Sequence, residues 1–117
     1  MTHFGQHIMV VRKARQETDR VFSLRQVAAR VGLEPSYLSK VERGETPPPS
    51  EQAILRLAVE LDEDPDVLLA LAGKVSTELQ QIILKRPRLF AELLRQLKTA
   101  PDAAVLRVVR EVRDGEW

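Results

Sequence analysis

The chain has 117 residues, of which 44% are hydrophobic and 30% are charged, a composition typical of a folded globular protein. It contains no cysteine, which excludes disulfides and thiolate metal sites, and its net charge of +1 does not by itself indicate a nucleic-acid partner. No run approaches the ~20 apolar residues that span a bilayer, and the first residues do not have the pattern of a signal peptide. We therefore expect a cytoplasmic protein with no membrane partner.

Charge is distributed unevenly along the chain. Residues 1–50 carry a net charge of +3, residues 51–74 of −4 and residues 75–117 of +2. A basic first half followed by an acidic segment is compatible with one face turned toward phosphates.

Hydrophobic periodicity is helical nearly throughout, so the sequence predicts an all-α fold. The spacing of Phe4, Ile8, Val11 and Arg15 predicts a first helix over residues 4–17.

Capping signals place the next two helices. Ser23 and Gln26 form a capping box, which predicts a second helix that stops at Gly32. Pro35 suits a first helical position and opens a third helix that runs to about Arg43.

Two more helices follow a stretch of three prolines. Ser50 is expected to cap a fourth helix that ends at about Leu61, and Asp64 with Pro65 opens a fifth. These five helices are expected to form one compact domain over residues 1–74.

The remaining residues, 75–117, are predicted to form a helical extension of about three helices, near 77–86, 87–98 and 101–114. Each has an apolar stripe, although 43 residues are unlikely to hold a stable core alone. The extension either forms a dimer with a second copy or folds back to complete the monomer core. In the dimer, the expected contacts are Phe90, Leu93, Leu97, Val105, Val109 and Val112.

The second and third helices have the layout of a DNA-reading pair. Such a pair needs a small residue where its helices touch, which Ala28 supplies, and a tight turn, which Gly32 supplies. Leu38 and Val41 then anchor the third helix, whose outer face can reach base edges in the major groove.

The residues that carry a family resemblance are Ser-Leu-Arg-Gln-Val-Ala at 23–28 and Tyr-Leu-Ser-Lys-Val-Glu-Arg-Gly at 37–44. They resemble the lambda-repressor-like, XRE-type helix-turn-helix regulators, and the resemblance covers about residues 6–73. It implies a five-helix domain that binds double-stranded DNA. By position, the expected base-reading residues are Pro35, Ser36, Tyr37, Ser39 and Lys40.

The resemblance also implies a structural ion pair. In these regulators, the glutamate that corresponds to Glu42 pairs with an arginine of the first helix. Here this suggests Arg15, with Arg12 as the alternative.

Two departures from the family pattern concern phosphate contacts. Leu24 stands where relatives often have a glutamine that contacts phosphate, and Glu45 stands where many have a basic residue. The expected phosphate contacts are therefore Arg15, Arg25 and Arg43.

Simpler interpretations remain open for several of these residues. Lys40 is either a base contact or an ordinary solvated lysine, and Tyr37 either packs against the domain or contacts a thymine methyl. Arg25 and Arg43 are either phosphate contacts or solvated surface.

Other charged or metal-ligating groups favour structural interpretations. The basic run Lys85-Arg86-Pro87-Arg88 is expected to be solvated, and His3 and His7 lack a third metal ligand. No arrangement of catalytic residues is present, so we expect neither an enzyme nor a cofactor or metal site.

The sequence thus predicts a transcriptional regulator, a repressor that acts as a homodimer on a near-palindromic operator. The alternative is an antitoxin-like or adaptor module whose last helices bind a partner protein.

Overall fold

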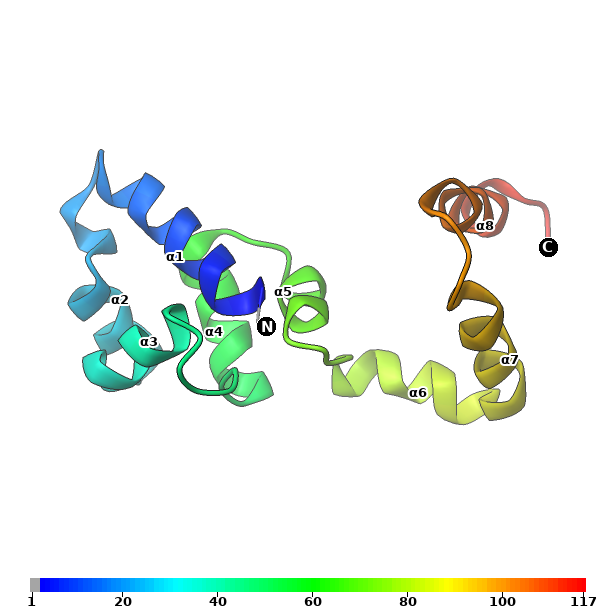
Figure 1. Cartoon of the computed structure of the whole chain (residues 1–117), viewed down its shortest axis with the longest axis horizontal. Coiled ribbons are helices and arrows are strands. Elements are labelled where there is room, and N and C mark those ends of the chain that lie inside the picture. The colour runs from blue at the N-terminus through cyan, green and yellow to red at the C-terminus, as the bar shows by residue number, and fades with distance from the viewer. Residues whose placement is uncertain (1–2) are drawn as a thin grey trace. The chain divides into compact units, whose positions relative to one another are not determined.

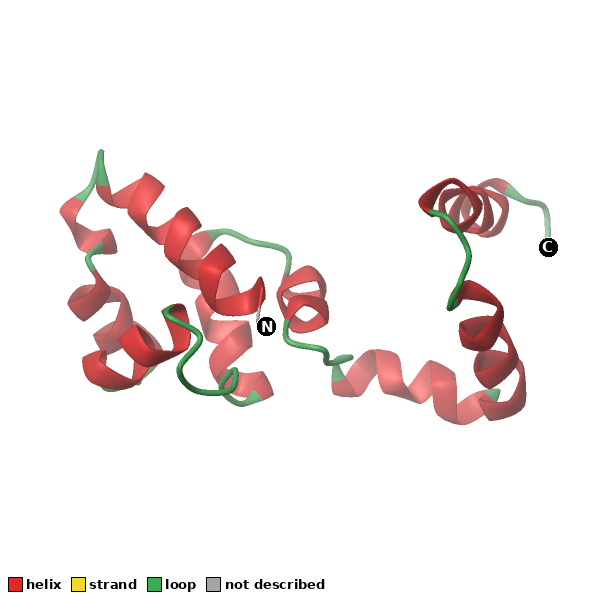
Figure 2. Ribbon diagram, in the orientation of Figure 1, coloured by secondary structure: helices red, strands yellow, loops and turns green. Residues whose placement is uncertain are grey.

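The computed structural model describes residues 3–117, and every regular element in that range is helical (Figures 1 and 2). The all-α prediction is therefore confirmed. The elements are α1 (His3–Gln16), η1 (Arg20–Phe22, a 3₁₀ helix), α2 (Leu24–Val31), α3 (Pro35–Glu42), α4 (Glu51–Leu61), α5 (Pro65–Leu71), α6 (Thr77–Lys85), α7 (Pro87–Leu97) and α8 (Asp102–Asp114).

Side-chain caps fix where the helices of the first half begin. The Ser23 hydroxyl accepts from the backbone N–H of Gln26 at 3.3 Å, which is the serine half of the expected capping box. Ser50 caps α4 through the backbone N–H of Ala53, and Asp64 caps α5. Local hydrogen-bonding chemistry thus accounts for these helix starts.

The sequence patterns did not predict one element, which lies between the first two expected helices. The short helix η1 is capped by the Asp19 carboxylate, which accepts from the backbone N–H of Val21 at 3.1 Å. The ring of Phe22 lies under two guanidinium groups, those of Arg15 at 5.7 Å and Arg30 at 5.8 Å. These contacts fix the chain just before α2.

The chain divides into two compact units, of which the first ends at Ser76 and the second spans Thr77–Trp117. The first unit has a continuous apolar core to which α1 to α5 all contribute. Its fully or almost fully buried members are Phe4, Ile8, Val27, Ala28, Val31, Leu38, Val41, Ile54, Leu57, Ala58, Leu61, Leu68 and Leu69. This core holds the elements on which the candidate site lies.

The second unit consists of α6, α7 and α8, and no residue of these three helices is buried. Large apolar side chains remain at its surface, among them Leu89 and Val112, which are 69% and 64% exposed. Because burial of apolar surface is the main stabilising term in folding, a unit without buried residues is marginally stable alone.

None of the helices in the described range combines the length and the apolar character that crossing a membrane requires.

Candidate nucleic-acid interface

The turn between α2 and α3 is tight and depends on Gly32, whose φ of +74° lies in the left-handed region. The backbone N–H of Leu33 donates to the carbonyl of Ala28 at 2.9 Å, which closes the end of α2. Two residues later, Pro35 occupies the first turn of α3. The two helices are therefore held in a fixed relation by backbone geometry.

The inner face of α3 is anchored in the core. Leu38 is fully buried and Val41 is 2% exposed, and Ala28 on α2 is fully buried beside them in the same cluster. These are the residues expected to anchor the pair.

The outer face of α3 carries the residues expected to read bases. Ser36 and Lys40 are exposed, whereas Pro35 and Ser39 are half-buried. Tyr37 is half-buried and packs against the hydrophobic core, which accounts for part of its ring without contact to a ligand. The most accessible polar groups on this face are therefore those of Ser36 and Lys40.

The prediction that Glu42 pairs with Arg15 is wrong, because Arg12 is its partner. The Nε and Nη2 atoms of Arg12 donate to the two carboxylate oxygens of Glu42 at 2.6 and 2.8 Å. Both residues are only 4% exposed, so a buried bidentate ion pair joins α1 to the end of α3. Arg15 instead lies over the ring of Phe22.

The error has a physical cause in the register of α1. The buried stripe contains Phe4, Ile8 and Arg12, spaced four residues apart, so the buried face continues through Arg12 to its carboxylate partner. An arginine joins a buried face only when its charge is compensated, and the periodicity of apolar residues does not reveal that partner. A further hydrogen bond from Arg12 to the carbonyl of Phe22, at 3.2 Å, links the same residue to η1.

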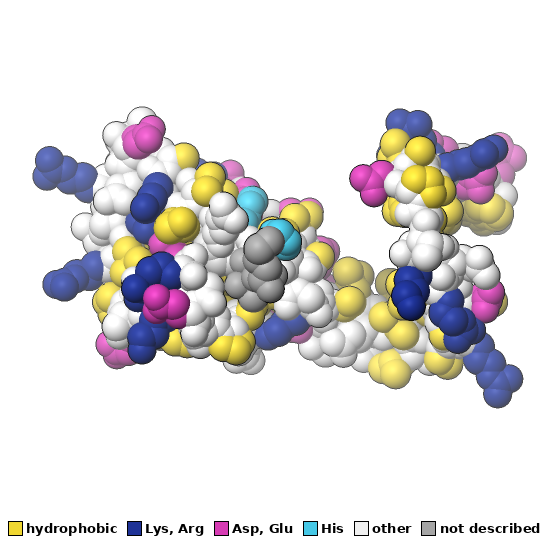
Figure 3. All heavy atoms as spheres, viewed as in Figure 1, with side chains coloured by type: hydrophobic (Ala, Val, Ile, Leu, Met, Phe, Trp, Pro, Cys, Tyr) yellow, Lys and Arg dark blue, Asp and Glu magenta, His cyan; other side chains and the backbone are white. Residues whose placement is uncertain are grey.

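The residues expected to contact phosphate differ in their surroundings. Arg25 is exposed in the first turn of α2. Arg43 is also exposed, but its Nε donates to the carbonyl of Ser39 at 3.2 Å and its Nη1 lies 3.3 Å from the carboxylate of Glu45. Arg43 therefore already has an anionic neighbour, while Arg15 is engaged with an aromatic ring. Figure 3 shows several Lys and Arg side chains over the part of the first unit that contains α1 to α3.

Sequence reasoning did not identify Arg30, which supports this region from α2. Its Nη2 donates to the carbonyl of Val21 at 2.6 Å, and its Nε donates to Glu60 of α4 at 2.6 Å. The helical periodicity of α2 could not indicate these partners, which lie 9 and 30 residues away along the chain.

Two other polar groups have structural contacts. His7 Nε2 lies 2.6 Å from the carboxylate of Glu63, which joins α1 to the segment between α4 and α5. Asp64 belongs to the helix cap already described, as predicted for the start of the fifth helix.

The tight turn, the buried anchors and the exposed outer face of α3 together define a helix-turn-helix. A family model described as a helix-turn-helix domain matches residues 9–71, more than half of the chain. The chain belongs to this family, which confirms the resemblance drawn from residues 23–28 and 37–44. No curated protein and no solved structure matches the chain.

Proposed function

We propose that the protein is a sequence-specific DNA-binding transcriptional regulator, a repressor that acts as a homodimer on a near-palindromic operator. The observation that carries this proposal is the outer face of α3, whose exposed polar residues stand on a helix that is anchored on its other side by Leu38 and Val41. A helix of this kind fits the major groove, where base edges present distinct patterns of donors and acceptors.

The proposal gives the polar residues two roles. Ser36 and Lys40 read bases, with Pro35, Tyr37 and Ser39 beside them. Arg25, Arg43 and Arg15 position the domain by contacts to phosphate, of which Arg25 is the least constrained by other partners. Loss of a phosphate contact weakens binding to all sequences, whereas loss of a base contact weakens discrimination.

The proposal of a homodimer follows from the limited number of bases that one helix can read. Each good base contact discriminates by about 1–3 kcal/mol, which is too little to select one operator among about 10⁶ or more competing sites. Two copies on a near-palindrome read twice as many bases, with half-sites about one helical turn apart. The exposed apolar side chains of the second unit supply a surface for this association. The expected contacts are Phe90, Leu93, Leu97, Val105, Val109 and Val112, of which Phe90, Leu97 and Val105 are half-buried and the other three are exposed.

One pair of variants separates the two contact classes. Lys40→Ala is expected to lower affinity for the selected site by about 1–3 kcal/mol and to relax base preference at one position, because a base contact is lost. Arg25→Ala is expected to weaken binding equally on specific and random duplexes and to reduce the salt dependence by about one phosphate contact. Fluorescence anisotropy titrations on both duplexes at several salt concentrations measure these effects. Equal loss from Lys40→Ala on both duplexes would refute its role in base reading.

Removal of the second unit tests the dimer. A chain that ends at Ser76 retains the whole buried core and is expected to fold as a monomer. This shortened chain is expected to bind a full operator markedly more weakly than the intact chain does. Analytical ultracentrifugation gives the oligomeric state. A shortened chain that remains dimeric would contradict the assignment of dimerisation to α6–α8.

The same exposed surface favours one rival function, an antitoxin-like or adaptor module that uses its last helices to bind another protein. That function predicts a monomeric purified chain, which forms a defined complex only with its partner. A homodimer at micromolar concentration would favour the regulator.

A further inference from the structure

The last helix, α8, has an apolar strip that the other described residues of the second unit leave largely exposed. Leu106, Val109 and Val112 are 46%, 50% and 64% exposed, and Val105 beside them is half-buried. An exposed row of large aliphatic side chains along one helix is a feature of association surfaces.

Charged residues lie at the two ends of this strip. Asp102, Val105, Val109 and Val112 recur at steps of three or four residues, so they share one face of the helix, and Arg113 lies on the same face. The strip therefore begins with a carboxylate and ends with a guanidinium group. Other charged residues of α8, among them Arg107 and Asp114, fall on the opposite face.

We propose that α8 pairs in antiparallel orientation with α8 of a second copy. This inference rests on the homodimer proposed above. The helix-packing pattern that seats one row of apolar residues between those of the partner places Val105 opposite Val109 of the second copy. The same register places Asp102 beside Val112 and Arg113 of the second copy. Because the interface has two-fold symmetry, each of these contacts occurs twice.

Charge favours the antiparallel orientation over the parallel one. In a parallel pair, Asp102 would face Asp102 and Arg113 would face Arg113, and like charges repel. In the antiparallel pair, opposite charges meet at both ends. Arg113 is available for this contact, since its present partner is the adjacent Asp114, at 2.8 Å on the surface, and such exposed pairs contribute little.

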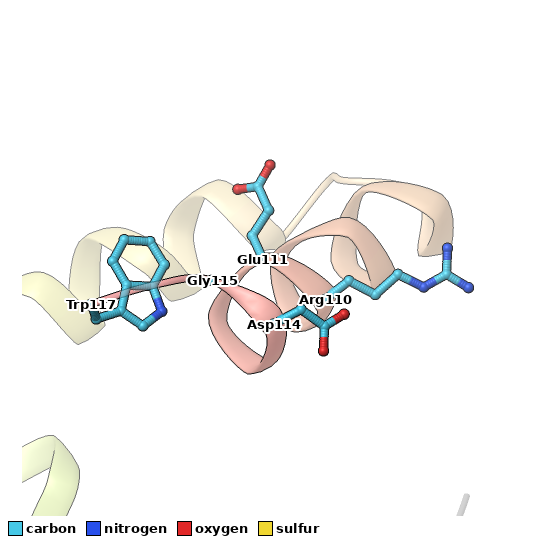
Figure 4. A pocket seen from close by; sticks show the side chains of 5 residues that line it. All are labelled: Arg110, Glu111, Asp114, Gly115 and Trp117. Carbon is cyan, nitrogen blue, oxygen red and sulfur yellow. The ribbon is translucent and has the colours of Figure 1, made fainter.

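A shallow hollow at the end of α8 lies on the side of the helix away from the strip. Trp117 is the only tryptophan in the chain, is 92% exposed, and its indole N–H donates to the carbonyl of Val112 at 3.1 Å. The hollow lies beside it and is lined by Arg110, Glu111, Asp114, Gly115 and Trp117. Figure 4 shows the side chains of Arg110 and Asp114 extending away from Trp117, so they do not converge on a small ligand. The hollow and the indole ring beside it therefore have no part in the proposed pairing.

Charge reversal at the ends of the strip tests the proposal in the full-length chain. Arg113→Asp places two like-charge contacts in the dimer, and it is expected to raise the dissociation constant about tenfold in sedimentation equilibrium. Arg107→Asp is the matched control, because it makes the same charge change on the opposite face and also breaks one surface ion pair, that with Glu111. This control is expected to change the dissociation constant less than twofold.

A mixture of two charge-reversed variants should restore dimerisation, a result that effects within one helix cannot produce. Asp102→Arg is expected to weaken its own homodimer, but an equimolar mixture with Arg113→Asp should form heterodimers with affinity close to that of the natural chain.

The interface is refuted if Arg113→Asp dimerises like the natural chain, if Arg107→Asp weakens the dimer equally, or if the mixture fails to recover. A natural chain that stays monomeric refutes both the interface and the homodimer, while sequence-selective DNA binding would still stand. A dimer that responds as expected but selects no DNA supports the interface and refutes the proposed regulator.

Discussion

Replacement of Arg12 with methionine is expected to lower the free energy of unfolding by about 3–5 kcal/mol, because it leaves the carboxylate of Glu42 buried without its cation. Both side chains are almost fully enclosed, and two hydrogen bonds of 2.6 and 2.8 Å join them. The loss is large relative to the stability of a small domain, about 5–15 kcal/mol at most. Urea unfolding followed by circular dichroism measures it.

Two further variants show whether the effect belongs to the pair. Arg15→Met removes only a contact over the ring of Phe22 at 5.7 Å, and it should cost no more than about 1 kcal/mol. The double variant Arg12→Met with Glu42→Leu removes both charges and should recover most of the loss. An Arg15→Met variant as unstable as Arg12→Met would show that the arginine at position 15 is the true partner.

Gly5→Ala is expected to destabilise the domain by about 3 kcal/mol, the upper end of the usual range for overpacking. Gly5 is buried in α1, and a Cβ at this position would overlap the backbone carbonyl oxygen of Val41 near the end of α3. Because the obstacle is backbone, it cannot rotate away as a side chain would. The same strain is expected to displace the end of α3, so DNA affinity should fall together with stability.

The direction of this effect is opposite to that of helix propensity. In an unconstrained helix interior, alanine is favoured over glycine by about 1 kcal/mol. Gln6→Ala, at the exposed neighbouring position, should therefore change stability by less than about 0.5 kcal/mol. A Gly5→Ala chain as stable as the natural one would contradict the close packing of α1 on α3. Thermal unfolding of the two variants makes the comparison.

Helix boundaries in the first unit could be predicted from the sequence because their causes are local. Ser23, Ser50 and Asp64 each bond a backbone N–H two or three residues away, and Gly32 supplies the left-handed turn that ends α2. Chemistry that acts over two or three residues can be read from the order of the residues alone.

Features that depend on distant partners could not be predicted in this way. The choice between Arg12 and Arg15 depends on which of two neighbouring stripes of α1 faces α3. Both stripes begin with Phe4 and Ile8. The contact from Arg30 to Glu60 likewise joins residues that are 30 positions apart. Periodicity also reveals apolar stripes on α6 to α8 without specifying what covers them.

Selection of random duplex DNA by the purified full-length protein, with sequencing of the bound pool, tests the central claim most directly. Our account predicts a symmetric motif with half-sites about one helical turn apart, and loss of preference at one base in each half-site for Lys40→Ala. Absence of enrichment even at low salt, where phosphate binding is strongest, would contradict a DNA-reading role for α3.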